Sequence, residues 1–403
     1  MNSMDQMKNT RYANIIPMKE LDTKEKRLYP FPIYDKLREE TPVRYDKERA
    51  CWDIFRYDDV HLVLKNPKLF SSRRSQGEKR ESLLIMDPPK HTQMRNLVNK
   101  AFTPKVIQEL EPRIAEITNG LLDEVIPNTR MDMVYDVAGP LPVIMIAELL
   151  GVPARDRQLF KAWSDVLVKG PEVNTDEAFT SVMAEKRQAS DELSDYFKDI
   201  LVQRRRKREN DLISLLLDAE IDGEKLSEEE LLGFCILLLV AGNETTTNLI
   251  VNAIRYMTED VPLQAHLRAH PELLPHAIEE TLRFYPPIQA IGRIATRDVE
   301  IGGQKVEAGS QVISWVAAAN RDGRKFAEAA RFVPTRKPNP HLGFGFGIHF
   351  CLGAPLARLE ARIVLGILLH RCIDIEREEG ALLHPIQSPF VFGVTHFPVR
   401  FRT

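Results

Sequence analysis

The 403-residue chain has no large excess of either charge, no long apolar run and few cysteines. Its 55 Lys and Arg face 58 Asp and Glu, so the formal charge of −3 creates no strong positive field to hold nucleic acid. No stretch supplies the roughly 18 consecutive apolar residues that a membrane span requires, and no basic-then-apolar export signal opens the chain. We therefore expect no nucleic-acid partner and no membrane span.

The four cysteines, Cys51, Cys235, Cys351 and Cys372, lie far apart without a CxxC spacing. This pattern argues against a disulfide framework and against a structural zinc site. Reduced thiols are typical of the cytoplasm, and we expect a cytoplasmic protein.

The chain shows no repeat period, and its 26 prolines are scattered instead of gathered in a linker. The apolar fraction of 43% and the charged fraction of 28% are those of an ordinary globular protein with a large core. We expect a single domain over residues 1–403, in which the residues before about Pro30 form a loosely ordered N-terminal segment.

The expected fold class is mainly α with a small β portion. Apolar positions recur at helical spacing through most of the region 104–284. Strands are predicted in a hairpin-like run over 43–57, in the alternating stretch 299–316 and in a last short strand ending near Phe401. The basic run RRRKR at 204–208 is expected to be a solvated helix end.

One predicted core helix contains a short run of residues that are unfavourable in a buried helix. Ser227 and Glu230 form a capping box, and the helix should continue through Tyr256. It is apolar on nearly all sides from 231 to 241 and then reads Gly242-Asn-Glu244-Thr245-Thr-Thr. This is either a kinked core helix whose threonines bond to their own backbone, or a proton relay in which the glycine opens the helix beside a ligand.

The segment HLGFGFGIHFCLGAPLAR, residues 341–358, places Cys351 between glycines, aromatic residues and a helix start at Pro355. A helix N-terminus stabilises a thiolate, and the rings of Phe344 and Phe350 would shield it from water. A nucleophilic role lacks an oriented base beyond His349, and zinc lacks further ligands. An axial thiolate to haem iron accounts for the cysteine, the glycines and the aromatic residues together.

Four motifs in this chain resemble those of the cytochrome P450 family. FGFGIHFCLG resembles its haem-ligand signature and AGNETT, residues 241–246, its oxygen-activating helix motif. EETLR resembles the ExxR motif, and DPPKHTQMR resembles a haem-propionate contact segment. The resemblance covers essentially the whole chain. LLLVAGNETTTNLI and HFCLGAPLARLEA resemble soluble enzymes of bacilli in the branch numbered 109.

This resemblance implies a P450 fold with haem b as cofactor and Cys351 as the proximal iron ligand, its charge tempered by backbone amides that include that of Gly353. The other implied cofactor contacts are Ala241 and Phe344, together with the propionate partners His91, Arg95, Arg293 and His349. Glu280, Arg283 and Arg336 would form a buried, structural ion network.

Glu244 and Thr245 match the family's acid and alcohol, which deliver protons to bound oxygen. Their presence favours a monooxygenase over a peroxide-driven peroxygenase or an isomerase. The third hypothesis is a non-catalytic haem protein that senses or stores a ligand, against which the thiolate motif argues.

By the same resemblance, apolar side chains would line the substrate pocket: Leu83, Ile85, Val166, Leu238, Ala241, Ile288, Ile291, Phe390 and Val391. They indicate a hydrophobic substrate such as a fatty acid, terpenoid or steroid. Electrons from NAD(P)H would arrive through a ferredoxin or flavodoxin and its reductase, which would dock on the cysteine side near Lys100, Arg95 and Arg362. We expect a monomer.

Overall fold

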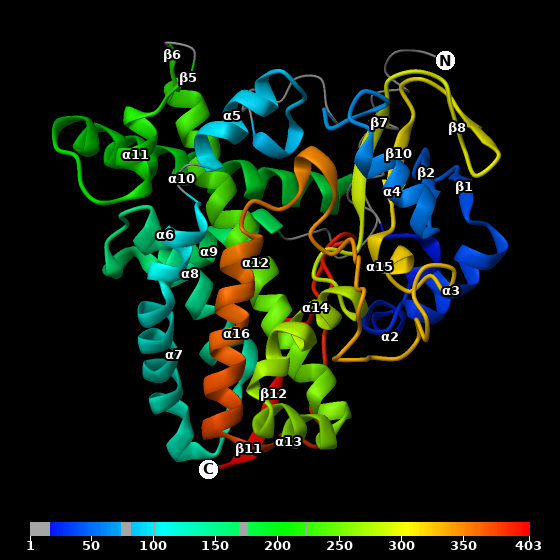
Figure 1. Cartoon of the computed structure of the whole chain (residues 1–403). Coiled ribbons are helices and arrows are strands. Elements are labelled where there is room, and N and C mark those ends of the chain that lie inside the picture. Colours follow the sequence, from blue (N-terminus) through cyan, green and yellow to red (C-terminus); the bar gives the residue numbers. More distant parts are fainter. Residues whose placement is uncertain (1–16, 74–81, 100–101, 169–175, 222–223) are drawn as a thin grey trace.

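The computed structural model describes residues 17–73, 82–99, 102–168, 176–221 and 224–403 (Figure 1). Most of these residues are helical, which confirms the mainly α fold class. The longer helices are α3 (Phe31–Glu40), α4 (Tyr57–Lys65), α5 (Lys90–Asn99), α7 (Glu111–Val125), α8 (Pro140–Leu149), α9 (Arg157–Val168), α10 (Asp176–Arg206), α12 (Glu228–Glu259), α13 (Val261–Ala269), α14 (Leu274–Phe284) and α16 (Ala354–Arg371). Shorter helices are α2 (Lys24–Leu28), α6 (Pro104–Glu109), α11 (Leu212–Asp218) and α15 (Val316–Ala319).

The main sheet has five strands in the order β1-β2-β10-β7-β3 and lies at one side of the helical body (Figure 1). Its strands are β1 (Val43–Asp46), β2 (Cys51–Ile54), β3 (Phe70–Ser71), β7 (Ile291–Ala295) and β10 (Gln311–Ser314). The predicted hairpin is confirmed, because β1 pairs antiparallel with β2, while β10 joins β2 in parallel.

The remaining strands form small separate sheets. They are β4 (Arg130–Asp132), β5 (Glu220–Ile221), β6 (Glu224–Lys225), β8 (Val299–Ile301), β9 (Gln304–Val306), β11 (Ile373–Arg377) and β12 (Pro398–Arg402). The hairpin β8–β9 and strand β10 confirm sheet structure in 299–316, and β12 confirms the last strand. Strand β4 interrupts the region expected to be wholly helical, because it pairs with β12 near the other end of the chain.

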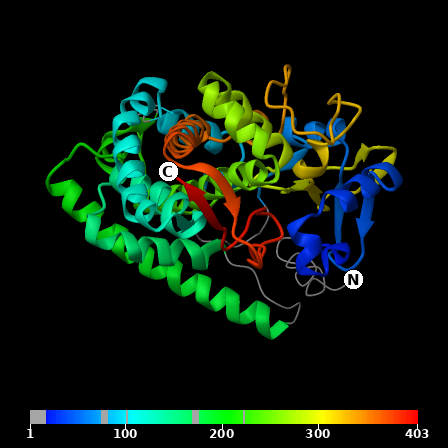
Figure 2. The ribbon, with the colours of Figure 1, turned by 90° about the horizontal axis from the view of Figure 1, so that it is seen from below.

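Helix α12 runs through the centre of the helical body and packs on α8, α9, α14 and α16 (Figures 1 and 2). Its predicted start is confirmed: the Ser227 hydroxyl accepts from the Glu230 amide at 3.2 Å, and the Glu230 carboxylate accepts from the Ser227 amide at 2.8 Å. Among the described helices, α12 alone is long and apolar enough to cross a membrane, and 56% of its most apolar window is buried inside the fold. Packing inside the protein core thus accounts for most of its apolar surface.

Two expectations for charged or terminal segments need correction. Residues 1–16 lie outside the described part, but residues 17–30 are not loose: they form η1 (Lys19–Leu21) and α2, with Met18 and Leu21 buried. In the basic run, Arg205, Arg206, Lys207 and Arg208 are exposed at the end of α10, as expected, and the exception is Arg204. It is 7% exposed, and its guanidinium donates to the Asp211 carboxylate and to the Gly151 carbonyl.

Candidate active site

The loop before α16 holds Cys351 by backbone geometry that glycine permits. Gly345 and Gly347 have φ values of +72° and +70°, where side chains with a Cβ are strained. The Phe344 carbonyl accepts from the Cys351 amide at 2.9 Å and closes the loop. Pro355 stands in the first turn of α16, as predicted from the sequence, so Cys351 lies directly before a helix N-terminus.

Two opposing effects act on the Cys351 thiol. Burial raises its pKa, whereas hydrogen bonding by the backbone amides of Gly353 and Ala354 and the charge of Arg95 lower it. Only one of the two expected shielding rings is enclosed by protein. Phe344 lies under the Arg358 guanidinium, 4.6 Å from its ring centre, whereas Phe350 is 40% exposed.

Cationic and hydrogen-bonding side chains surround His91 on α5. This side chain is 1% exposed, and neither ring nitrogen has a hydrogen-bond partner among the described residues. Its ring centre lies 4.2 Å from that of His349, whose Nε2 is 2.8 Å from the Ser72 hydroxyl. Burial, Arg95 and Arg293 all lower the pKa of His91, so both guanidiniums lie close enough to act on it. This cluster of cations and donors suits an anionic ligand.

Helix α12 is continuous through Gly242 to Thr247, so the local opening that one of the two alternatives required is not seen. The Thr245 hydroxyl donates to the Ala241 carbonyl at 2.6 Å, one turn back, as the core-helix interpretation anticipates. Packing explains the glycine at position 242 instead, because a Cβ there would stand 3.0 Å from the Ile146 side chain of α8. Ala241 is nevertheless exposed and Thr245 partly buried, so this face of α12 remains accessible.

Glu244 is held by Asn248, a residue that the motif did not reveal. The Asn248 amide donates to the Glu244 carbonyl at 2.7 Å and to its carboxyl Oε1 at 3.0 Å. Burial raises the pKa of Glu244, and the Asn248 hydrogen bond and Lys161 oppose that shift. Any Cβ at Gly393 would come within 1.8 Å of Asn248 Oδ1, so this glycine makes room for the amide. Asn248 could have been predicted, because it lies four residues after Glu244 and so on the same face of a helix. Nothing in the sequence connects Gly393 with this site.

The ion network of α14 is fully buried. Arg283 donates to both carboxyl oxygens of Glu280, at 2.7 and 2.9 Å, and both side chains are 0% exposed. Arg336 lies 3.1 Å from the same carboxylate, and the Asn339 amide donates to it at 3.1 Å. Glu279, the next residue, instead pairs with Arg358, and its pKa falls to about 2 through hydrogen bonds from Arg358 and His341 that outweigh burial.

The candidate pocket residues fall on four parts of the fold. Ile288 and Val391 form an isolated antiparallel bridge, which brings Ile291 and Phe390 onto neighbouring segments. Ile85, Val166 and Leu238 are partly buried, on η2 (Leu83–Ile85), α9 and α12. Leu83 is only 6% exposed and belongs to the main core, whereas its neighbour Leu84 is 48% exposed.

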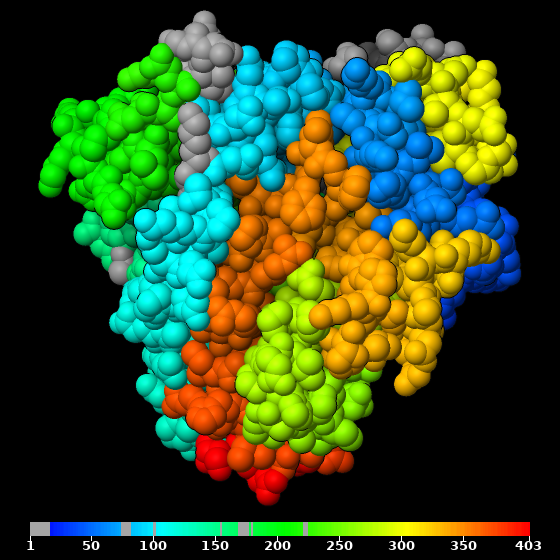
Figure 3. All heavy atoms as spheres, viewed as in Figure 1, coloured from blue at the N-terminus to red at the C-terminus, as the bar shows by residue number. Residues whose placement is uncertain are grey.

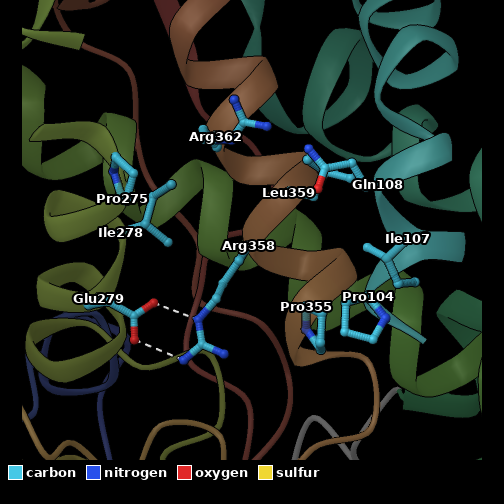
Figure 4. Close-up of a pocket in the computed structure, with 10 residues that line it drawn as sticks. All are labelled: Pro104, Ile107, Gln108, Pro275, Ile278, Glu279, Pro355, Arg358, Leu359 and Arg362. Carbon is cyan, nitrogen blue, oxygen red and sulfur yellow. Dashed lines mark hydrogen bonds and ion pairs between the residues drawn. The ribbon is translucent and has the colours of Figure 1, made fainter. Parts of the chain in front are cut away.

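A groove of about 340 Å³ lies between α6, α14 and the first turns of α16 (Figure 4). On the molecular surface, α16 is set between α7 and α14 on this face (Figure 3). Three residues of its lining form ion pairs: Glu279 pairs with Arg358 at 2.6 Å, and Arg362 pairs with Glu111 at 2.9 Å. The apolar lining consists of Pro104, Ile107, Pro275, Ile278, Pro355 and Leu359. The groove therefore lies beside the Cys351 loop. Lys100 is outside the described residues.

Comparison with known proteins gives a consistent result. The model of the family "Cytochrome P450" matches residues 36–373. A protein of Bacillus spizizenii, "Cytochrome P450 109", is 57% identical over 394 residues, which cover 98% of this chain and 97% of the relative. The putative cytochrome P450 YjiB of Bacillus subtilis is 47% identical over 379 residues, or 94% of this chain and 95% of the relative.

Solved structures agree with these relatives. CYP109E1 from Bacillus megaterium, in complex with testosterone, superimposes with a TM-score of 0.91 at 46% identity, covering 94% of this chain and 100% of the other. CYP109B1 from Bacillus subtilis has a TM-score of 0.86 at 47% identity, covering 93% of this chain and 100% of the other.

Proposed function

Because the chain belongs to the cytochrome P450 family, we propose that it hydroxylates a hydrophobic small molecule with molecular oxygen and electrons from a separate redox protein. Members of this family are monooxygenases that use haem iron, O2 and NAD(P)H-derived electrons. The observation that carries the proposal is Cys351 at the N-terminus of α16, facing the amides of Gly353 and Ala354. We place the protein in the cytoplasm, as a monomer.

The residues present fit a haem. A haem is flat, apolar over most of its area and dianionic at its two propionates. His91 offers two buried ring nitrogens without partners among the described residues, and Arg95, Arg293 and His349 lie around it. These residues would hold the propionates, and Cys351 would ligate the iron. Phe344, Gly353 and Ala241 would line the faces of the ring.

Bound haem supplies the activation of O2, from which one oxygen atom enters the substrate and the other leaves as water. The protein's task is to bring protons to that place. Burial raises the pKa of Glu244 and thereby makes its carboxyl hold a proton more strongly than an exposed glutamate does. The Thr245 hydroxyl, next in the chain and bonded to the Ala241 carbonyl, would pass the proton on to the accessible face of α12. Asn248 would keep the Glu244 carboxyl in position.

An apolar substrate is supported by the side chains expected around the pocket, in particular Ile85, Val166, Leu238 and Ile291. CYP109E1 has been solved in complex with testosterone and with corticosterone. Steroids are therefore suitable first test compounds, alongside fatty acids and terpenoids.

We propose that the electron donor, a ferredoxin or flavodoxin, docks over the groove beside the Cys351 loop. The groove offers an apolar floor with Arg358 and Arg362 in its lining, which suits a donor with an acidic rim. Arg362→Glu, at a groove residue whose side chain is 40% exposed, should slow reduction by the donor protein while dithionite reduction stays unchanged. Leu382→Glu, at a residue 80% exposed elsewhere, serves as control. Equal reduction rates for both variants would exclude this docking site.

The test of the proposed function is the absorption spectrum of the reduced protein with carbon monoxide. A strongly red-shifted Soret band that Cys351→Ala abolishes is the expected result, because an anionic sulfur opposite the gas causes the shift. Turnover then separates the reaction types. Product that requires O2 and NADPH supports a monooxygenase, and product from peroxide alone indicates a peroxygenase. Ligand binding without any product would indicate a sensor or a storage protein.

A further inference from the structure

Glu279 on α14 holds the segment 341–358, which contains Cys351, at both of its ends. Its carboxylate accepts two hydrogen bonds from the Arg358 guanidinium of α16, at 2.6 and 2.8 Å (Figure 4). The same carboxylate lies 3.0 Å from Nε2 of His341, whose Nδ1 accepts from the Gly343 amide at 3.1 Å. One carboxylate therefore fixes both Arg358 and the start of the loop that leads to Cys351.

The Arg358 guanidinium is held over an aromatic ring of the same loop. Its central carbon lies 4.6 Å from the ring centre of Phe344, within the range of a cation–π contact. Phe344 in turn contacts the cysteine directly, because its carbonyl accepts from the Cys351 amide at 2.9 Å. The Arg358 side chain is 37% exposed, so protein covers most of it. Glu279 and Phe344 thus keep one positive charge beside the Cys351 loop.

Arg362 offers an internal comparison, because it resembles Arg358 at the surface. The two residues stand about one turn apart on α16, both line the groove, and their side chains are 37% and 40% exposed. Each is paired with a glutamate of another helix. Of the two, Arg358 alone contacts an aromatic ring among the described residues. Burial raises the pKa of the Cys351 thiol, and the charge of Arg358 is among the influences that oppose this shift.

We propose that Arg358 is a positioning residue for electron uptake: its charge, fixed beside the Cys351 loop, makes the haem bound there easier to reduce. One electron passes from the redox protein to the iron, and no protein residue is oxidised or reduced. The iron and its sulfur ligand gain one negative charge in this step, so a fixed cation nearby stabilises the product more than the reactant. This assignment rests on the proposed function and gives a residue of the docking groove a second role, on the electron acceptor itself.

The experiment is a potentiometric titration of the haem-loaded protein with small redox mediators and without any donor protein. Arg358→Gln removes the charge but keeps a hydrogen-bond donor for Glu279, whereas Arg358→Lys keeps the charge without the planar fork. Arg362→Gln is the matched control, since it removes a charge of similar exposure from the same groove. The carbon monoxide band of each variant shows first that Cys351 still ligates the iron. Arg358→Met, a second neutral variant, repeats the test if Arg358→Gln does not retain haem.

Arg358→Gln should lower the equilibrium constant for one-electron reduction about threefold or more, whereas Arg358→Lys and Arg362→Gln should stay within about twofold of wild type. An unchanged constant in Arg358→Gln, or an equal decrease in Arg362→Gln, would overturn the assignment. An equal decrease in Arg358→Lys would also overturn it, since the contacts and not the charge would then matter. Loss of haem from both neutral variants would show a purely structural role instead. A normal carbon monoxide band with an unchanged constant would leave the proposed monooxygenase standing, so the two failures are distinguishable.

Discussion

Glu280→Gln tests the buried ion network at the point where it is densest. Three donors besides Arg283 converge on this carboxylate: the Val333 amide at 2.8 Å, Arg336 at 3.1 Å and Asn339 at 3.1 Å. The glutamine keeps the shape but removes the only negative charge facing two guanidiniums within the described network. Loss of one partner from a buried pair costs about 3–5 kcal/mol, since the remaining charge stays desolvated.

The assay is urea unfolding followed both by tryptophan fluorescence and by haem absorbance. Glu279→Gln is the matched control, an adjacent residue on α14 that also pairs with an arginine, but whose side chain is 28% exposed. We expect this control to lose less stability than Glu280→Gln, because solvent reaches the Glu279 side chain and partly screens its pair. If the two variants unfold within about 1 kcal/mol of each other, the argument from desolvation is refuted. Haem loss by Glu280→Gln before unfolding would show that the network supports the cofactor site directly.

Two further variants address the proposed proton path on α12. Thr245→Ala should keep haem but divert electrons to hydrogen peroxide, measured as peroxide formed per NADPH consumed. The control Thr247→Ala should not increase peroxide formation. Unchanged coupling of NADPH consumption to product in Thr245→Ala would remove Thr245 from the path. Asn248→Ala removes the hydrogen bond that lowers the pKa of Glu244 against burial, so that pKa should rise further. Protonated Glu244 would then persist to higher pH, and the alkaline limb of coupled turnover should shift upward. Asn243→Ala, which removes hydrogen bonds to Ser164 and Thr247 but none to the Glu244 carboxyl, should leave the pH profile in place.

Local signals predicted much of this architecture. The capping box fixed the start of α12, because Ser227 and Glu230 are near neighbours whose geometry the helix itself determines. The hairpin β1–β2 and the turn into α16 at Pro355 were predictable for the same reason. Strand β4 was not, since its residues extend only to pair with β12, and such long-range pairing leaves no periodicity in a short segment.

In the candidate site, too, some features follow from the local sequence and others depend on distant residues. Cys351 and the Glu280–Arg283 pair were predictable, because residue type and spacing indicate their chemistry. Of the two alternatives for α12, the structure does not show the local opening at Gly242, since the glycine accommodates the Ile146 side chain and the helix is continuous there. A sequence gives the conformational freedom of a glycine but not the neighbour that needs the space.

Unsatisfied polar groups carry information that the motifs do not. The ring of His91 is withdrawn from solvent without a hydrogen-bond partner among the described residues, although desolvation normally forces such groups to pair. Buried cations of this fold do pair, as Arg204 does with Asp211 and Arg283 with Glu280. His91 lies against His349 of the Cys351 loop, with ring centres 4.2 Å apart. Its partner is therefore to be supplied by a ligand, and an anionic cofactor suits that place.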